Sequence, residues 1–419
     1  MDSNEADRNG VSRQAAPTVA RDDSPRRASA WEVFLVFVRL GLTSFGGPIA
    51  HLGYFRTEFV ERRRWLDDRA YADLVALCQF LPGPASSQVG IAIGLQRAGW
   101  AGSAAAWLGF TTPSALLLVA FGYGIERHAA LAGSGAIHGL KVAAVAVVAQ
   151  AVWGMARSLC PDRPRAGLAI GAALLTLALP GAAGQLGAIG LSALAGLALP
   201  AGTSAAAVAR HPSSGVSRRA GAAALLLLAG LLAGLPLASA VTGSATLALI
   251  DGFVRAGALV FGGGHVVLPL LQSIVVPAGV VGDAEFLAGY GAAQAVPGPL
   301  FTFAAYLGTV MHAPLSGAAG GLVFLLAIFA PAYLLVVGAL PFWDSLRRND
   351  RVRVALAGVN AGVVGILLSA LYDPVWVGAI GSRADFGLAL AAFGLLVHAR
   401  WPPLAVVLLA AAGGWWFGS

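Results

Sequence analysis

The sequence predicts an all-α protein that crosses a membrane several times and consists of two homologous halves in inverted topology, with broken or re-entrant helices. Three observations predict this fold class. The 419 residues are 58% hydrophobic and only 11% charged, whereas soluble globular proteins carry about 25% charged residues. Stretches such as 222–237 are continuously apolar, as membrane helices require and as the alternating strands of an outer-membrane barrel do not. Finally, one pair of motifs occurs twice.

The duplicated motifs define the two halves. The first copy reads FVRLGLTSFGGP from Phe37 and later QFLPGP from Gln79; the second reads FVRAGALVFGGG from Phe253 and QAVPGP from Gln294. The glycine motifs are 216 residues apart and the proline motifs 215. Two spaced motifs that recur in the same order indicate an internal duplication, and in so apolar a chain such repeats are typical of secondary transporters.

Composition divides the chain into four parts. Residues 1–30 are polar and lack the apolar core of a signal peptide, so we expect a disordered cytosolic tail. Residues 31–200 are predicted to form the N-terminal half, and residues 201–219 a polar cytosolic linker. Residues 220–419 are predicted to form the C-terminal half, which begins with an additional apolar span before its copy of the motifs.

The basic loops predict opposite orientations for the two halves. Loop 56–69 contains three consecutive arginines, 62–64, which place it in the cytosol, and its counterpart around Asp283 has no basic residue. Loop 344–353 is also basic, and its counterpart near Glu126 is nearly neutral. Equivalent loops therefore lie on opposite sides of the membrane, as an inverted repeat requires and a parallel repeat does not.

The first apolar segment is predicted to break and return. The tail before it and loop 56–69 after it both have cytosolic character, so a simple span would separate two parts of the same side. A break at Gly46-Gly47-Pro48 would resolve this. The alternative is that a long tail carries no topological information, because the charge rule applies mainly to short loops.

Arg39 and Arg255 occupy the same place in the two copies, each within an apolar run. A charged residue at the centre of a membrane helix costs about 2.5–3.5 kcal/mol, so its presence in both halves indicates a use. Guanidinium groups bind oxyanions through two parallel hydrogen bonds. We expect the two arginines to face a shared aqueous cavity and hold an anion; the alternative is snorkelling, or a structural ion pair with Asp251 or Glu32.

The Gly-Gly and Pro-Gly-Pro motifs are predicted to break helices beside a ligand. Pro84 is placed to start a new helix whose first turn contains Ser86, Ser87 and Gln88. Helix N-termini offer free N–H donors and partial positive charge, and matched broken helices indicate a transporter's binding site. The alternative is a role in kinks and close helix packing. The candidate substrate-binding residues are Arg39, Ser44, Gly46, Gly47, Gln79, Pro82, Gly83, Pro84, Ser86, Arg255, Gly262, Gly263, Gln294, Pro297, Gly298 and Pro299.

Four further polar residues are candidates for coupling transport to an ion gradient. Lys141 aligns with Asn360, so one half has an amine where the other has a neutral amide; a helix-end lysine is an equal alternative. His51 and His265 follow the glycine motifs, where a histidine is either a proton relay or a solvated interfacial side chain.

Several functional classes lack their sequence signatures. The chain has no metal-ligand cluster, no Walker-type phosphate loop and no dinucleotide fingerprint, so neither a metal nor another cofactor is expected. No polar stretch is long enough for the nucleotide-binding domain of an ATP-driven pump. Cys78 and Cys160 are expected to be unpaired thiols. The net charge of +7 comes from short loops beside apolar runs, which favours the positive-inside pattern over nucleic-acid binding.

The motifs resemble those of the chromate transporter family. The resemblance extends from Trp31 to Trp376 and rests on FVRLGLTSFGGPIAHLGYF, WLDDRAYADLVALCQFLPGP and FGGGHVVLPL, together with TTPS at 111–114, FAPA at 329–332 and YDPVW at 372–376. It implies a two-domain, multi-pass protein of the bacterial inner membrane that exports chromate, driven by an ion gradient or a membrane potential. Gly264 and His265 depart from the first-half pattern, so the halves are not interchangeable.

The leading hypothesis is therefore a secondary transporter that exports chromate and confers chromate resistance, not an enzyme. Sulfate or another tetrahedral oxyanion is the alternative cargo, since a site of this kind recognises shape and charge. A membrane-embedded enzyme is the rival from another class, but no nucleophile, metal or acid–base pair is visible in the apolar segments. A passive channel is disfavoured because no continuous polar stripe is visible. The expected partners are the oxyanion and the lipid bilayer, a homodimer is left open, and no nucleic acid is expected.

Overall fold

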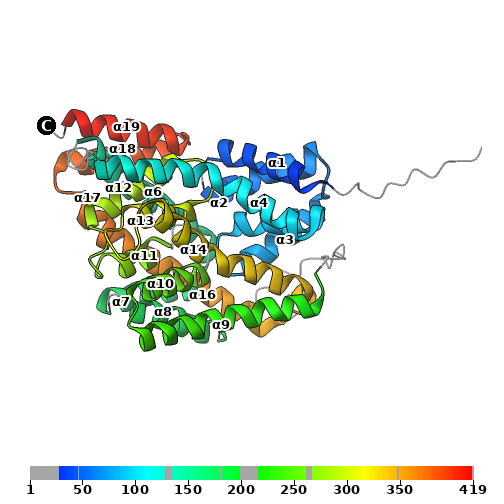
Figure 1. Ribbon diagram of the computed structural model, residues 1–419. Helices are drawn as coiled ribbons and strands as arrows, with labels where there is room; N and C mark the ends of the chain where they lie inside the picture. The colour runs from blue at the N-terminus through cyan, green and yellow to red at the C-terminus, as the bar shows by residue number, and fades with distance from the viewer. Residues whose placement is uncertain are drawn as a thin grey trace, which may run out of the picture.

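The computed structural model describes residues 28–45, 47–127, 135–179, 182–198, 216–260, 267–346 and 349–417. Within these ranges the chain is a bundle of helices with no β-strand (Figure 1). The predicted all-α class is confirmed.

Among the described residues, five helices are long and apolar enough to cross a membrane: α4 (Ala85–Arg127), α6 (Gly135–Leu159), α9 (Arg218–Thr242), α14 (Gly317–Ala339) and α16 (Asp350–Ala370). A span needs about 20 residues. Helix α4 is longer because two segments meet at Ala98 and Gly99, where Gly99 has φ +61°. A Cβ on Gly94 would collide with the carbonyl of Gly102, so the first segment lies directly against the second.

The other helices are shorter than a span, and those that carry the motifs occur in pairs broken at the motifs. In the first half, α1 pairs with α2, and α3 pairs with the first segment of α4; in the second half, α10 pairs with α11, and α12 with α13. The bounds are α1 Ala30–Thr43, α2 Gly47–Arg56, η1 Thr57–Arg62, α3 Asp68–Phe80, α7 Arg163–Ala178, α8 Ala182–Gly196, α10 Ala245–Leu259, α11 Val267–Val275, α12 Asp283–Ala295, η3 Leu300–Thr302, α13 Phe303–Val310, η4 Leu340–Phe342, α15 Trp343–Leu346, η5 Leu371–Trp376, α17 Val377–Ala379, α18 Arg383–Val397 and α19 Pro403–Phe417.

The first apolar segment returns to the side on which it started, as predicted. The ring of Phe55, near the end of α2, packs edge-on against that of Phe37 in α1, with 5.6 Å between centroids. Beyond α2, the Arg63 guanidinium reaches the carboxylate of Glu32, in the first turn of α1, at 3.1 Å. The start of α1 and loop 56–69 therefore lie on one side.

The pairs of the two halves occupy opposite parts of the bundle. In Figure 1, α1, α2 and α3 lie at the right, while α10, α11, α12 and α13 lie at the left. The second-half pairs also fold back on themselves: the Tyr306 hydroxyl in α13 donates to the carbonyl of Glu285, in the first turn of α12, at 2.9 Å. Two sets of half-helices thus enter from opposite sides, which agrees with an inverted repeat.

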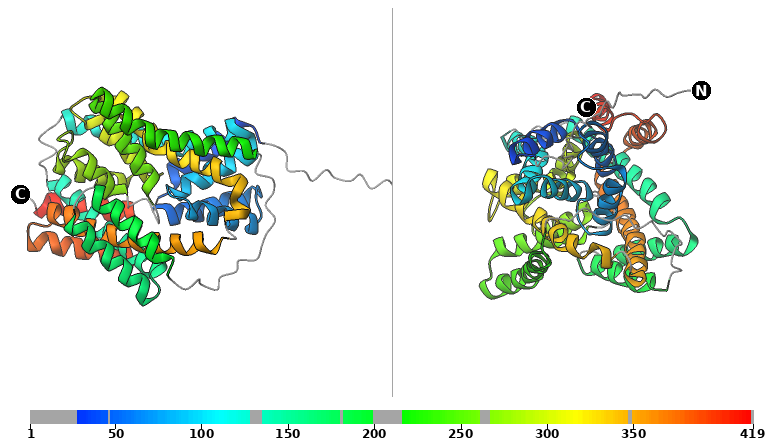
Figure 2. Two further views of the ribbon diagram at one scale, coloured as in Figure 1. Left: turned by 90° about the horizontal axis from the view of Figure 1, so that it is seen from below. Right: turned by 90° about the vertical axis from the view of Figure 1, so that its right-hand side faces the viewer.

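The terminal helix pair of each half packs on a long helix of the other half. A Cβ on Gly358 of α16 would collide with the carbonyl of Ser192 in α8, and a Cβ on Gly139 of α6 would collide with the carbonyl of Ala410 in α19. Small residues allow such close approach of membrane helices. The halves are consequently interleaved, and Figure 2 shows the blue helices of the first half beside yellow and orange helices of the second.

Candidate functional site

The Pro-Gly-Pro loop of each half is hydrogen-bonded to the broken helix of the other half. The N–H of Gly83 donates to the carbonyl of Val260 at 2.6 Å, and the N–H of Gly298 donates to the carbonyl of Ser44 at 2.9 Å. Val260 and Ser44 are equivalent residues, one residue before the Phe-Gly-Gly motifs. The two bonds are therefore reciprocal, and the four breaks meet around one pseudo-twofold centre.

Glycine is required at both contacts. Gly83 has φ +120° and Gly298 has φ +102°, in the region that side-chain-bearing residues rarely adopt. A Cβ on Gly298 would lie 2.8 Å from the Ser114 hydroxyl, and a Cβ on Gly83 would lie 3.2 Å from the Cβ of Ala332. Ser114 and Ala332 end the TTPS and FAPA motifs, so each loop also touches the matching motif of the opposite half.

Helix α4 begins at this centre. Its first turn is closed by the hydrogen bond from the N–H of Gln88 to the carbonyl of Pro84, at 3.0 Å. The N–H groups of Ala85, Ser86 and Ser87 precede that bond and have no partner within the helix. They supply donors and the positive end of the helix dipole at the place where the halves meet.

Buried polar side chains surround this helix start. The Ser86 hydroxyl lies 3.2 Å from Nδ1 of His51, whose ring packs edge-on against Phe110 at 5.3 Å between centroids. Gln88 is fully buried and donates through Nε2 to the carbonyl of Pro82 at 2.7 Å. The cluster thus joins α2, the Pro-Gly-Pro loop and α4.

Five buried side chains in this region each have one polar atom without a hydrogen-bond partner in the described part of the chain. Within the part of the chain that the structure describes, no hydrogen-bond partner reaches the following atoms, all in residues at most 3% exposed: Ser44 Oγ, His51 Nε2, Ser87 Oγ, Gln88 Oε1 and Thr111 Oγ1. A buried polar group without a partner costs about 1–3 kcal/mol. His51, Ser87 and Gln88 lie at the helix start, Ser44 lies at the neighbouring break, and Thr111 follows Phe110, whose ring packs on His51. Together these atoms indicate a place that a polar ligand completes.

The equivalent surface of the second half is apolar. Aligning the motifs places Val260, Val267, Phe301, Phe303 and Phe329 where the first half has Ser44, His51, Ser86, Gln88 and Thr111. The hydroxyl of Thr302, the counterpart of Ser87, is satisfied by the carbonyl of Pro299 at 2.7 Å. One exception is Gln294, whose Nε2 is buried and has no partner among the described residues. The candidate site therefore belongs mainly to the first half.

The two arginines are not placed at this centre. Arg39 is exposed on α1 and has no ion pair within the described ranges. Arg255 donates through Nε to both carboxylate oxygens of Asp251 at 2.8 Å, and through a terminal nitrogen to the carbonyl of Leu232 in α9 at 3.2 Å. Figure 1 shows α1 and α10 well apart. The structural ion pair that the sequence offered as the alternative is thus present in the second half.

The other predicted residues are divided between the centre and its surroundings. Gly47, Pro82, Gly83, Pro84, Pro297, Gly298 and Pro299 lie at the breaks. Gln79 is exposed, and Lys141 and Asn360 are half-buried on α6 and α16. Gly46, Gly262, Gly263 and His265 lie outside the described residues.

Sequence reasoning did not include Ser87, Gln88, Thr111 and Ser114 among the candidates. A signal was present for Gln88, Thr111 and Ser114, because the second copy has the apolar residues Phe303, Phe329 and Ala332 at these positions. Ser87 carried no such signal, because its counterpart is Thr302. No group of three or more His, Cys, Asp or Glu side chains in the described part of the chain is arranged to hold a metal ion.

Comparison with known proteins agrees with the architecture. The model of the chromate transporter family matches twice, at residues 31–199 and 247–415, leaving α9 between the two matches. A chromate transport protein of Pseudomonas aeruginosa is 29% identical over 92% of this chain and 91% of its own length. A probable chromate transport protein of Synechococcus elongatus is 28% identical over 80% and 82%, and a chromate transport protein of Cupriavidus metallidurans 26% over 81% of each.

No solved structure matches this chain. The family model nevertheless covers both halves and so most of the sequence. The chain belongs to the chromate transporter family.

Proposed function

We propose that this protein is a secondary transporter that exports chromate across the bacterial inner membrane and so confers chromate resistance, and that it binds the anion at the start of α4. The observation that carries the site is the set of five unused, buried polar atoms, three of them in residues at a helix start, beside the reciprocal Gly83 and Gly298 contacts. The chromate transport role follows from the family and from the relatives that carry that name.

The chemistry of the cluster suits a tetrahedral oxyanion. Three backbone N–H groups and the hydroxyls of Ser44, Ser87 and Thr111 are all able to donate. Oriented amides at a helix N-terminus bind anions without a cationic side chain. His51 can add a fourth side-chain donor through Nε2 if its Nδ1 accepts from Ser86. In this proposal Arg39 and Arg255 act outside the site.

The membrane potential suffices to drive export. A dianion that leaves a cell with a negative interior gains about 2.3 kcal/mol per charge per 100 mV, or about 4.6 kcal/mol in total. This supports a concentration ratio of roughly a thousandfold, at about 1.4 kcal/mol per factor of ten. Export therefore requires neither ATP nor an obligatory proton.

Radiolabelled chromate flux in everted membrane vesicles tests the proposal. Parent vesicles should accumulate chromate when a potential is imposed, and Ser87→Ala should lose most of this uptake. Thr302→Val is the matched control, because its hydroxyl occupies the equivalent position but is already bonded to Pro299. Equal loss in both variants, at equal protein levels, would contradict a first-half site.

The same vesicles separate the alternatives. Competitive inhibition by sulfate, with accumulation of radiolabelled sulfate, would identify a general oxyanion transporter. Chromate uptake into these everted vesicles that persists after the potential is collapsed, while the pH gradient is kept, would contradict potential-driven export. Conversion of chromate to a reduced product by the purified protein would support the enzyme hypothesis instead.

A further inference from the structure

A groove lies beside the Pro-Gly-Pro loop of the first half. It has a volume of about 490 Å³ and lies between that loop, α8 and α16. Its walls include Leu81 and Pro82 from the loop, Ala193 and Leu197 from α8, and Leu356 from α16. All of these are apolar, and Pro82 is the residue whose carbonyl holds Gln88 of the candidate site.

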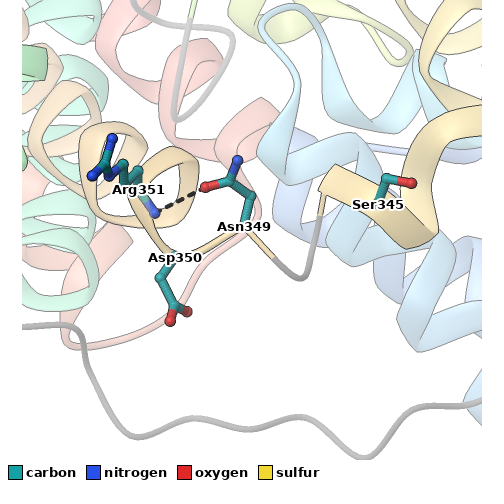
Figure 3. A pocket seen from close by; sticks show the side chains of 4 residues that line it. All are labelled: Ser345, Asn349, Asp350 and Arg351. Carbon is teal, nitrogen blue, oxygen red and sulfur yellow. Dashed lines mark hydrogen bonds between the residues drawn. The ribbon is translucent and has the colours of Figure 1, made fainter.

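One charged residue lines this groove. Arg351, in the first turn of α16, also lines a neighbouring open pocket of about 590 Å³ together with Ser345, Asn349 and Asp350 (Figure 3). The side chain of Asn349 accepts from the N–H of Arg351 at 3.1 Å and so caps α16. Arg351 therefore lies at the junction of the pocket and the groove, beside the positive end of a long helix.

The nearby carboxylate does not neutralise Arg351. Figure 3 shows the carboxylate of Asp350 pointing away from the guanidinium of Arg351. Asp350 is instead paired with Arg353 at 2.9 Å. Within the described ranges no carboxylate is paired with Arg351.

We propose that this groove is the cytosolic entrance for the oxyanion and that Arg351 concentrates anions at its mouth. The inference rests on the proposed export function and adds the route to its site. Charge at the mouth of a cleft with low-dielectric walls focuses the field and raises the local concentration and on-rate of an oppositely charged substrate. The position within the basic loop 344–353 places this mouth on the cytosolic side.

Thiol labelling measures the local potential without requiring transport. Leu356→Cys, in a background with Cys78→Ala and Cys160→Ser, should react faster with an anionic sulfonate thiol reagent than with a cationic trimethylammonium reagent of the same size. Arg351→Gln should lower the anionic rate several-fold and raise the cationic one, and Arg353→Gln should change neither by as much. Equal rates before and after Arg351→Gln would overturn the inference, even if transport is intact.

Flux in everted vesicles supplies the second readout. Arg351→Gln should raise the KM for chromate several-fold at low ionic strength and leave the maximal rate unchanged, and the difference should fade as salt screens the charge. Arg351→Lys should restore the KM, since only charge is needed. A fall in maximal rate with unchanged KM, or an equal effect of Arg353→Gln, would contradict the entrance role. Loss of transport in the parent would instead contradict the proposed function, and the labelling result would still stand.

Discussion

The two halves share their backbone plan but differ in what they place at the centre. Both present a Pro-Gly-Pro loop whose glycine donates to the opposite half, at 2.6 and 2.9 Å. Around these loops the first half has Ser44, His51 and Gln88, and the second half has Val260, Val267 and Phe303 at the same positions. After duplication, the contacts that hold the centre together were thus retained twice, whereas the polar cluster is present once.

The largest effect is expected at the glycine contacts that the two halves share. Gly83→Ala and Gly298→Ala should each abolish most chromate flux, because alanine at φ +120° or +102° costs about 1–3 kcal/mol and the added Cβ collides with its neighbours. The two losses should be similar in size. Vesicle flux normalised to membrane protein level checks this, and a large effect in only one half would show that the centre is not reciprocal.

The next largest effect is expected in the polar cluster, which is present in the first half only. Thr111→Val and His51→Phe remove unused polar atoms and keep much of the volume, so flux should fall by tenfold or more, at about 1.4 kcal/mol per factor of ten. The stability of Thr111→Val should be unchanged or slightly increased, because an unsatisfied buried group disappears, whereas His51→Phe also removes the partner of the buried Ser86 hydroxyl and should lower stability. Phe329→Leu is the second-half control at the position of Thr111 and should affect flux through packing alone. Normal flux in Thr111→Val and His51→Phe would remove the polar cluster from the mechanism.

A smaller effect is expected when polarity is moved into the second half. Phe303→Gln places an amide where the first half has Gln88, but in a fully buried aromatic cluster with Phe286 and Tyr290. Thermal unfolding in detergent should occur at a lower temperature, as burying an unpaired amide costs about 1–3 kcal/mol. Creation of a second functional site, with increased flux, would show that the halves are more interchangeable than their contacts indicate.

The smallest effects are expected at the duplicated arginines. Arg255→Gln breaks the pair with Asp251 and should lower stability by about 1 kcal/mol or less, given its partly exposed side chain. Arg39→Gln should change little, since Arg39 is exposed on α1. Chromate resistance and flux check both, and a loss of flux of more than tenfold at normal protein levels would return these arginines to the binding site.

The positions of the helix breaks could be predicted from the sequence, but the side chains that surround these breaks could not. Glycine pairs and Pro-Gly-Pro interrupt a helix whatever surrounds them, so the return of α1–α2 and the start of α4 followed from local chemistry. The arginines left two explanations open, because a charge inside an apolar run serves either a ligand or a structural pair, and the i, i+4 spacing of Asp251 and Arg255 favoured the structural pair for Arg255. The roles proposed for Ser44 and Thr111 could not be predicted from the sequence, because they depend on tertiary contacts: the Ser44 carbonyl accepts from Gly298 of the other half, and Phe110, next to Thr111, packs on His51.

The terminal helix pair of each half packs on the other half, so neither half is packed independently of the other. Helices α7 and α8 pack on α16, and helices α18 and α19 pack on α6, so each half covers a long helix of the other. A severed half would expose the glycine seam of its own long helix and an unsupported hairpin. The two halves are therefore packed into each other as one unit rather than as two separate domains.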